Sequence, residues 1–188
     1  ITVPKNSAYD EPIIINNDTS KEAFSHIIIL AEENSRITVI DKDFSEKESS
    51  YYSKCVELVL KDNAKVTYIH IQNLKNNRFN FCFKKAKTSK DSEIRWFDLF
   101  TGSDFCVSRT DCELEKQGSS AEALGVFIGT EKQQFDINNT TRHIEPYTTS
   151  NIKIKKVLDD DTKSIYNGLI RIEKEASDIR KMWSDEEI

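Results

Sequence analysis

The segment Asn34-Ser35-Arg36-Ile37-Thr38-Val39-Ile40 returns one fixed step later as Asn63-Ala64-Lys65-Val66-Thr67-Tyr68-Ile69. In both copies a short polar turn leads into a run rich in β-branched and aromatic residues, which is typical of a β-strand. A fixed step of this length, from position 34 to position 63, is typical of stacked supersecondary units, each of which buries its apolar face against its neighbours. This repeat guides the interpretation of the rest of the chain.

Shorter echoes of the repeat continue toward the C-terminus. They begin at Asp91, Ser120 and Ser150, and they place positions 37, 66, 94, 123 and 152 in one predicted register with a nearly constant step. Alternating apolar runs predict strands at His26–Leu30, Ile37–Ile40, Cys55–Leu60, Val66–Ile71, Phe79–Phe83, Ile94–Phe100 and Ile165–Ile172. Strands in both halves of each step, with no helical pattern between them, indicate an all-β coil.

The pattern therefore favours a β-helix, or flattened β-solenoid, over a βαβ fold. An antiparallel sandwich with evenly spaced hairpins stays open at this point, because it also produces regularly spaced short strands. The tail Glu173–Ile188 breaks the strand pattern and carries Ile179, Met182 and Trp183 at helical spacing. We therefore expect a short C-terminal helix that covers the last turn of the coil.

Composition limits the classes of function. The 188 residues fit one domain, residues 1–188. The 27 basic and 32 acidic residues are scattered and give a net charge of -5, which argues against binding to nucleic acid or to an anionic membrane. No apolar run reaches the ~18 residues of a membrane span, and residues 1–10 do not resemble a secretory signal. A cytoplasmic protein with reduced cysteines is expected, and the start at Ile1 suggests a trimmed or excised chain.

A string of motifs in the second half carries a family resemblance. The motifs are Thr101-Gly102-Ser103, Gln133-Gln134-Phe135-Asp136, His143, Thr148-Thr149-Ser150, Lys156-Val157-Leu158-Asp159 and the run from Ser164 to Arg171 with Asn167-Gly168. Together they resemble the SufB/SufD family of the SUF system, the scaffold proteins of iron–sulfur cluster assembly. Softer similarity extends upstream to Val3, so the resemblance covers nearly the whole chain.

The resemblance implies a right-handed parallel β-helix that serves as a scaffold subunit and is not an enzyme by itself. It implies three kinds of partner: a SufC-type ATPase, a SufB/SufD-like partner or a second copy of the chain, and a sulfur donor protein. It also implies a transient iron–sulfur cluster in the assembled complex, with no metal site firmly implied for the chain alone.

Cys112 is the candidate sulfur acceptor, because Thr110-Asp111-Cys112-Glu113-Leu114 resembles the SufB strand that bears the cysteine implicated in sulfur acceptance. Accepting sulfur requires a thiolate, so an accessible cysteine with a lowered pKa is expected, with Arg109 and Lys116 as candidates to lower it. The alternative is a small buried side chain. Cys55 lies close to two steps earlier, which predicts both thiols in one inward-facing column.

The three histidines carry less information. His143 matches a family histidine and is a candidate iron ligand or base, although a histidine in a strand often only donates hydrogen bonds. His26 and His70 have no partner at a recognised ligand spacing.

The resemblance has one large departure and leaves alternatives open. Family members continue through further rungs and ATPase-binding helices that are missing here, so we expect either a fragment or a shortened homologue. A β-helical carbohydrate-active enzyme is the second hypothesis, although no carboxylate pair at rung spacing supports it. A structural or assembly module that has lost the cluster chemistry is the third.

Overall fold

The computed structural model describes residues 1–19, 23–45, 51–74, 78–174, 176 and 178–187, and all of its regular elements are β-strands. The first seven strands are β1 (Thr2–Val3), β2 (Ile13–Asp18), β3 (Ala23–Ala31), β4 (Arg36–Phe44), β5 (Tyr51–Leu60), β6 (Lys65–Leu74) and β7 (Phe79–Thr88). The others are β8 (Glu93–Gly102), β9 (Phe105–Leu114), β10 (Ser120–Gly129), β11 (Gln134–His143), β12 (Thr149–Leu158), β13 (Lys163–Ile172) and β14 (Arg180–Glu187).

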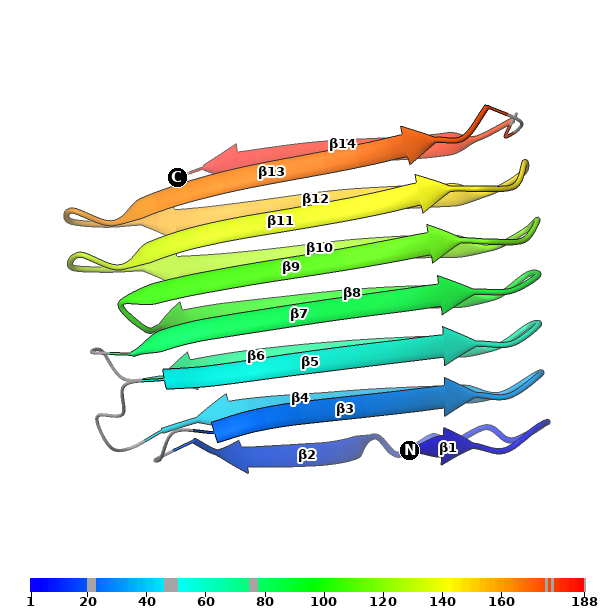
Figure 1. The fold of residues 1–188 in the computed structure, drawn as a ribbon, viewed down its shortest axis with the longest axis horizontal. Helices are drawn as coiled ribbons and strands as arrows, with labels where there is room; N and C mark the ends of the chain where they lie inside the picture. Colours follow the sequence, from blue (N-terminus) through cyan, green and yellow to red (C-terminus); the bar gives the residue numbers. More distant parts are fainter. Residues whose placement is uncertain (20–22, 46–50, 75–77, 175, 177, 188) are drawn as a thin grey trace.

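The strands form two parallel sheets. Odd-numbered strands make one sheet in the order β1 to β13, and even-numbered strands make the other in the order β14 to β2. We call them the odd sheet and the even sheet. In Figure 1 the nearer odd strands run rightward, the fainter even strands run leftward, and the chain climbs with each turn, which is the sense of a right-handed coil. The predicted parallel β-helix is confirmed, and parallel pairing throughout excludes the antiparallel sandwich.

Alternation along each strand explains why the two sheets face each other. Successive side chains of a strand point to opposite faces, so every second residue enters the space between the sheets. Val56, Leu58 and Leu60 of β5 point inward and are at most 1% exposed, whereas Glu57 between them points to the outer face. Tyr68 and Trp96 continue the apolar core on the even sheet with an edge-to-face contact at 5.4 Å.

The turns that connect each odd strand to the following even strand share a backbone conformation. One residue in each has a positive φ between 52° and 76°: Asn6, Asn34, Asn63, Asp91, Gly118, Tyr147 and Asp178. Asparagine and aspartate tolerate this left-handed region better than most residues do. The Asn63 side-chain amide donates to Asn34 Oδ1 at 3.1 Å, and Asn34 donates to Asn6 Oδ1 at 2.9 Å. The repeat seen in the sequence is therefore a ladder of hydrogen-bonded turns.

The seven predicted strands are confirmed, but part of the predicted register is wrong. Ile37 pairs with Val66 and Val66 with Ile94, as expected. Ile94 then pairs with Ala121 and not with Ala123, so this rung is two positions shorter than the sequence pattern predicts. The reason is a short turn at positions 103–104, between β8 and β9, where the corresponding turn between β10 and β11 spans positions 130–133. A shift of two keeps the same face inward, so the sequence pattern concealed it.

The predicted C-terminal helix is wrong for the described residues of 173–188. β14 forms there and pairs in parallel with β12, with Thr149 opposite Arg180 and Ile152 opposite Trp183. An isolated helix of this length is marginal in water, whereas the edge of β12 offers unpaired backbone groups that a further strand satisfies. In the described part of the chain, no helix has the length and apolarity that a membrane crossing requires.

Candidate functional site

Charged side chains are buried between the sheets in the first half of the coil. Asp41 and Asp43 point inward from β4, Lys54 from β5 and His70 from β6, and each is at most 1% exposed. Lys54 Nζ donates to Asp41 Oδ2 and Asp43 Oδ1 at 2.5 Å each, and His70 Nε2 lies 2.7 Å from Asp43 Oδ2. We call these four residues the ionic cluster.

Hydroxyl and amide donors complete the hydrogen bonding of the ionic cluster. Tyr68 donates to Asp41 at 2.6 Å, Tyr52 donates to Asp43 at 3.1 Å, and the Asn17 amide donates to both carboxylates. Burial alone would raise the pKa of Asp43, but the hydrogen bond and charge of His70, together with Lys54, lower it to about 2. Asp43 is thereby held as a charged acceptor inside the coil.

Further along the coil the interior polar groups surround Cys112. Its Sγ accepts a hydrogen bond from Trp96 Nε1 at 3.2 Å, and its side chain is 4% exposed. The nearby Lys84 is also buried and donates to Asp98, with its ammonium 5.6 Å from the ring centroids of Trp96 and Phe100. Cys112 thus lies in a closed interior that combines an aromatic donor with a buried ion pair.

Burial dominates the acidity of Cys112. It raises the thiol pKa to about 12, against smaller lowering effects from the Trp96 hydrogen bond and the charge of Lys84. The sequence offered Arg109 and Lys116 as candidates for lowering this pKa. Arg109 Nε lies 4.0 Å from Asp111 Oδ1, and Lys116 Nζ lies 4.0 Å from Glu145 Oε1. In this conformation Cys112 is a protonated, enclosed thiol, which is the opposite of the accessible thiolate that sulfur acceptance requires.

The predicted column of Cys55 and Cys112 is wrong. Cys55 pairs with Phe83, which pairs with Arg109, so Cys55 and Cys112 differ by three positions in register. Because an odd difference inverts the face, Cys55 is half-buried on the outer face while Cys112 points inward. The other inward thiols are Cys82, 3.8 Å from His70 Nδ1, and Cys106, whose pKa burial raises to about 12.

His143 is fully buried at the end of β11. Its Nδ1 lies 2.6 Å from Thr148 Oγ1, and its Nε2 lies 2.9 Å from Ser150 Oγ. Burial, with a smaller effect from the charge of Lys181, lowers the pKa of His143 to about 4. A neutral imidazole held by two hydroxyls is a stable structural arrangement, and both nitrogens that could bind a metal already have partners.

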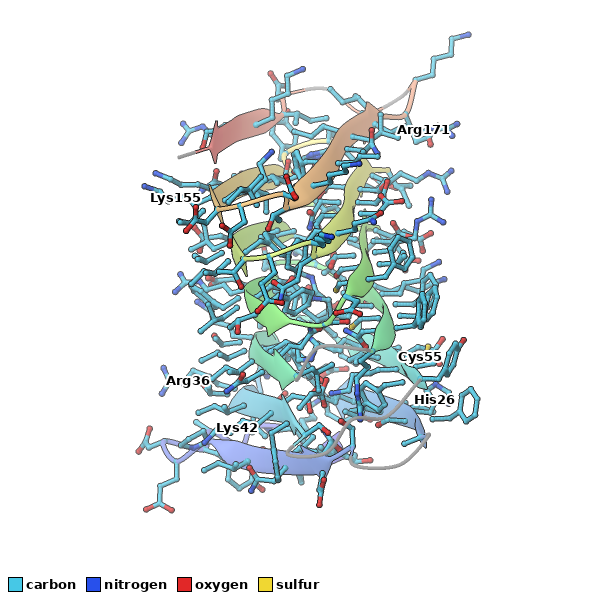
Figure 2. All side chains as sticks on the ribbon, turned by 90° about the vertical axis from the view of Figure 1, so that its left-hand side faces the viewer. His26, Arg36, Lys42, Cys55, Lys155 and Arg171 are labelled. Carbon is cyan, nitrogen blue, oxygen red and sulfur yellow. The ribbon has the colours of Figure 1, made fainter. Side chains whose placement is uncertain are left out.

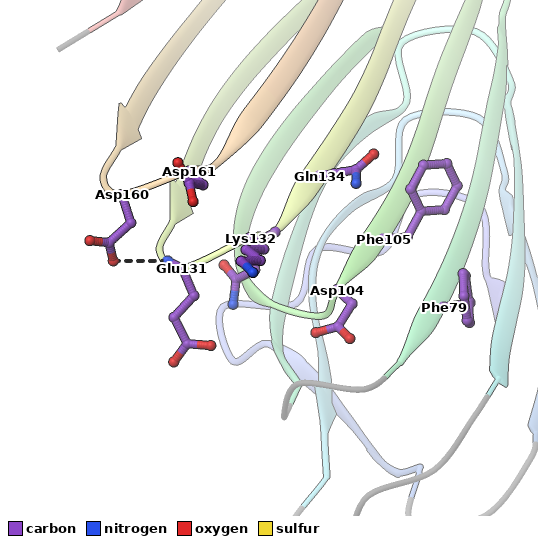
Figure 3. A pocket seen from close by; sticks show the side chains of 9 residues that line it. Phe79, Asp104, Phe105, Glu131, Lys132, Gln134, Asp160 and Asp161 are labelled. Atoms are coloured by element: carbon purple, nitrogen blue, oxygen red, sulfur yellow. Dashed lines mark hydrogen bonds between the residues drawn. The ribbon is translucent and has the colours of Figure 1, made fainter.

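A groove opens at the turns that connect even strands to the following odd strands (Figure 3). These turns lie on the other side of the coil from the hydrogen-bonded Asn6, Asn34 and Asn63. The lining residues of the groove are Phe79, Asp104, Phe105, Glu131, Lys132, Gln133, Gln134, Asp160 and Asp161. The Glu131 backbone N–H donates to Asp160 Oδ2 at 3.0 Å, which links two successive turns. The four acidic residues lie in turns, whereas the carbohydrate-active alternative calls for carboxylates converging on an exposed sheet.

The chain matches a known protein family over most of its length. The family model described as "SUF system FeS cluster assembly, SufBD core domain" matches residues 13–186. The chain belongs to the SufBD family. The resemblance carried by the motifs from Thr101 to Arg171 is thereby confirmed.

Relatives support the SufBD assignment. "Iron-sulfur cluster assembly SufBD family" proteins of Staphylococcus saprophyticus, Staphylococcus epidermidis and Staphylococcus aureus are each 27% identical to this chain over 186 residues. Each match covers 96% of this chain and 40% of the relative. The chain therefore spans about two fifths of the length of these relatives.

The SufBD motif residues have structural roles in the coil. Thr148 and Ser150 hold His143, and Gly102, with φ +75°, forms the tight turn before β9. Sequence reasoning missed the ionic cluster and dismissed His70, because its partner Asp43 comes from the neighbouring rung of the even sheet. The signal was present in the repeat, since residues one step apart on the inward face become neighbours.

Proposed function

We propose that this chain forms the β-helical core of a scaffold-type subunit of the SUF iron–sulfur cluster assembly complex. The observation that carries the proposal is the SufBD core-domain match over residues 13–186, on a chain that folds as a parallel coil. In this role the chain is not an enzyme by itself. An iron–sulfur cluster is its transient cargo, and the complex is cytoplasmic.

Cys112 is the sulfur acceptor in this proposal. Its thiolate would attack the outer sulfur of a persulfide on the donor protein, forming a new S–S bond while the donor's S–S bond breaks and the donor thiolate leaves. The Trp96 N–H and the charge of Lys84 favour the thiolate, while burial opposes it. Transfer therefore requires the interior to open near β9, so that Cys112 meets the donor and its proton can leave.

The proposed partners are a SufC-type ATPase, a sulfur donor protein, and a SufB/SufD-like subunit or a second copy of this chain. Among the described residues, β13 and β14 are the last strands of the odd and even sheets, and each has a described neighbour on one side. Such edges present backbone donors and acceptors to another strand. For His143 to bind iron in the assembled complex, one ring nitrogen would have to exchange its Thr148 or Ser150 partner for the metal.

Two experiments test the proposal. In the first, iron and sulfide are added anaerobically to the chain alone and with a SufC-type ATPase, and cluster absorption and complex formation are measured. We expect ATPase binding, with cluster formation in the assembled complex. If neither is observed, the scaffold role is refuted and only the fold and family assignment stand.

In the second experiment, a persulfide-bearing donor is mixed with Cys112→Ser and with Cys106→Ser. Cys106 is a matched control, since it is also buried and its pKa is also raised to about 12. Mass spectrometry after alkylation should find the added sulfur in wild type and Cys106→Ser but not in Cys112→Ser. Equal sulfur acceptance by Cys112→Ser would refute the acceptor role and favour a module that has lost this chemistry.

A further inference from the structure

Three metal-binding side chain types meet on the outer face of the odd sheet, away from the interior thiols. His26 of β3 and Cys55 of β5 are direct partners in the parallel register, and Glu57 lies two positions beyond Cys55 on the same face. One potential ligand atom of each residue lies within 4.8 Å of the other two. Figure 2 shows His26 and Cys55 together on one outer side of the coil.

We propose that His26, Cys55 and Glu57 bind a divalent first-row transition-metal ion, with Zn²⁺ as the reference ion of the class. The donors are an imidazole nitrogen, a thiolate sulfur and a carboxylate oxygen, a set that Zn²⁺ accepts and that Mg²⁺ and Ca²⁺ do not favour because of the sulfur. Water completes a tetrahedral shell. We call this the outer site, and it does not rest on the proposed role in cluster assembly.

The geometry of the outer site is close to what a tetrahedral ion requires. Ligand atoms about 2.0–2.3 Å from Zn²⁺ stand roughly 3.5 Å from one another. The three candidate ligand atoms lie within 4.8 Å of one another, an upper bound about 1 Å above that spacing, and the 2.8 Å between His26 Nε2 and Glu57 Oε2 would widen on binding. The His26 and Glu57 side chains are 54% and 51% exposed, so they are free to rotate inward without disturbing the core.

The charges at the outer site also favour a cation. His26 Nε2 lies 2.8 Å from Glu57 Oε2, and Glu57 lies two positions from Cys55 on the same face, so its negative charge attracts a cation to the three donors. A bound ion replaces the proton between His26 and Glu57, and the Cys55 proton leaves to solvent. Lys85, the register partner of Glu57, has its ammonium 3.1 Å from Glu113 on β9, toward the opposite side.

The described residues contain a second cluster of potential metal ligands, formed by Asp41, Asp43 and His70. It differs from the outer site because a cationic side chain already lies between its ligands. There the Lys54 ammonium lies 2.5 Å from an oxygen of each carboxylate and takes the place of a metal ion. At the outer site a hydrogen bond joins His26 Nε2 and Glu57 Oε2 instead. The His26 and Glu57 side chains are about half exposed, so their pairing contributes little to the stability of the fold and substitutions at the outer site should leave the coil intact.

The test uses the full chain, residues 1–188, freed of metal and of any histidine tag. Co²⁺ is titrated while the near-ultraviolet thiolate-to-cobalt charge-transfer band is followed, and Zn²⁺ affinity is measured by competition with a chromogenic chelator. We expect one ion per chain, displacement of Co²⁺ by Zn²⁺, and no displacement by excess Mg²⁺. Cys55→Ser should abolish the band, and His26→Gln and Glu57→Gln should each weaken Zn²⁺ binding at least ~10-fold.

Asp136→Asn is the matched control, because it removes one negative charge from the outer face of the same sheet, on β11, which β7 and β9 separate from β5. It should bind Zn²⁺ as wild type does, and circular dichroism should show that every variant is folded. A wild-type chain without the charge-transfer band would overturn the proposal. So would a band that survives in Cys55→Ser, or equal weakening of Zn²⁺ binding by Glu57→Gln and Asp136→Asn. Binding lost in His70→Gln but kept in His26→Gln would place the ion in the interior and also overturn it.

Discussion

Replacing Lys54 by Met tests whether buried charges stabilise the first half of the coil. Its ammonium lies 2.5 Å from an oxygen of both Asp41 and Asp43, and all three side chains are at most 1% exposed. Removing one partner of a buried ion pair costs about 3–5 kcal/mol, because the remaining charge is left without compensation. We expect Lys54→Met to lower the free energy of unfolding by about this amount.

A double-mutant cycle with Asp41→Asn isolates the interaction. The double variant removes one charge of each sign and leaves the Asp43–His70 pair, which is 2.7 Å apart. Its loss should therefore be smaller than the sum of the single losses, with a coupling of about 1–3 kcal/mol. Urea unfolding, followed by circular dichroism and tryptophan fluorescence, measures each variant. Additivity within about 0.5 kcal/mol, or a Lys54→Met loss below about 1 kcal/mol, would refute the reasoning.

The same cluster predicts an acid dependence. The pKa of Asp43 falls from 3.8 to about 2 on folding, so its contribution is fully present above about pH 4 and is lost as the pH falls toward 2. The difference corresponds to about 2 kcal/mol. In Lys54→Met one of the groups that lower this pKa is gone, so the wild-type and variant stabilities should converge at low pH.

Three further substitutions or measurements follow from single contacts. Gly102→Ala should cost about 2–5 kcal/mol in urea unfolding, because at φ +75° its Cβ would lie 1.6 Å from the Leu74 carbonyl oxygen; a loss below about 1 kcal/mol would contradict the turn geometry. The lowered pKa of His143, about 4 against 6.5, predicts about 3 kcal/mol of stability that is present above pH 6.5 and lost as the pH falls to 4. His143→Gln should abolish that pH dependence, and an unchanged profile would be inconsistent with it. Brief iodoacetamide treatment and peptide mass spectrometry should modify Cys55 before Cys112 in the folded chain, and equal rates would show that the interior is open.

The alternation of apolar and polar residues was sufficient to predict the strands and the coiled fold. Alternation places β-branched residues at Ile37 and Val66 one step apart, and that alone predicts stacked rungs. The alternation could not predict the exact register. The short turn at 103–104 shortens one rung and displaces Ala123 by two positions without changing the face to which it points. Turn length depends on local backbone geometry, and the strand pattern carries no record of it.

The errors at the cysteines and at the tail have a common origin. Positions 55 and 112 are close to two average steps apart, but the rungs that separate β5, β7 and β9 are shorter than average, and the odd remainder put Cys55 on the opposite face. At Glu173–Ile188 three apolar residues at helical spacing were outweighed by the edge of β12. In both cases a neighbouring rung decided the outcome. The buried Lys54 and His70 were missed for the same reason, because their partners come from other strands of the coil.

The pairing of each strand with only its neighbours in one sheet has a consequence for how such a protein can change length. β10 contacts β8 and β12 through the same backbone ladder that joins every other pair, so gaining or losing a whole turn by duplication or deletion leaves every surviving pair in register. Two sets of buried charges are the exceptions, the Lys84–Asp98 pair of β7 and β8 and the ionic cluster. The ionic cluster joins β4, β5 and β6 through paired charged side chains. A recombination point between Asp41 and His70 would therefore leave a buried charge without its partner. Exchange of turns between related coils is therefore expected beyond β8 and opposed from β4 to β8, where these buried charges need their partners.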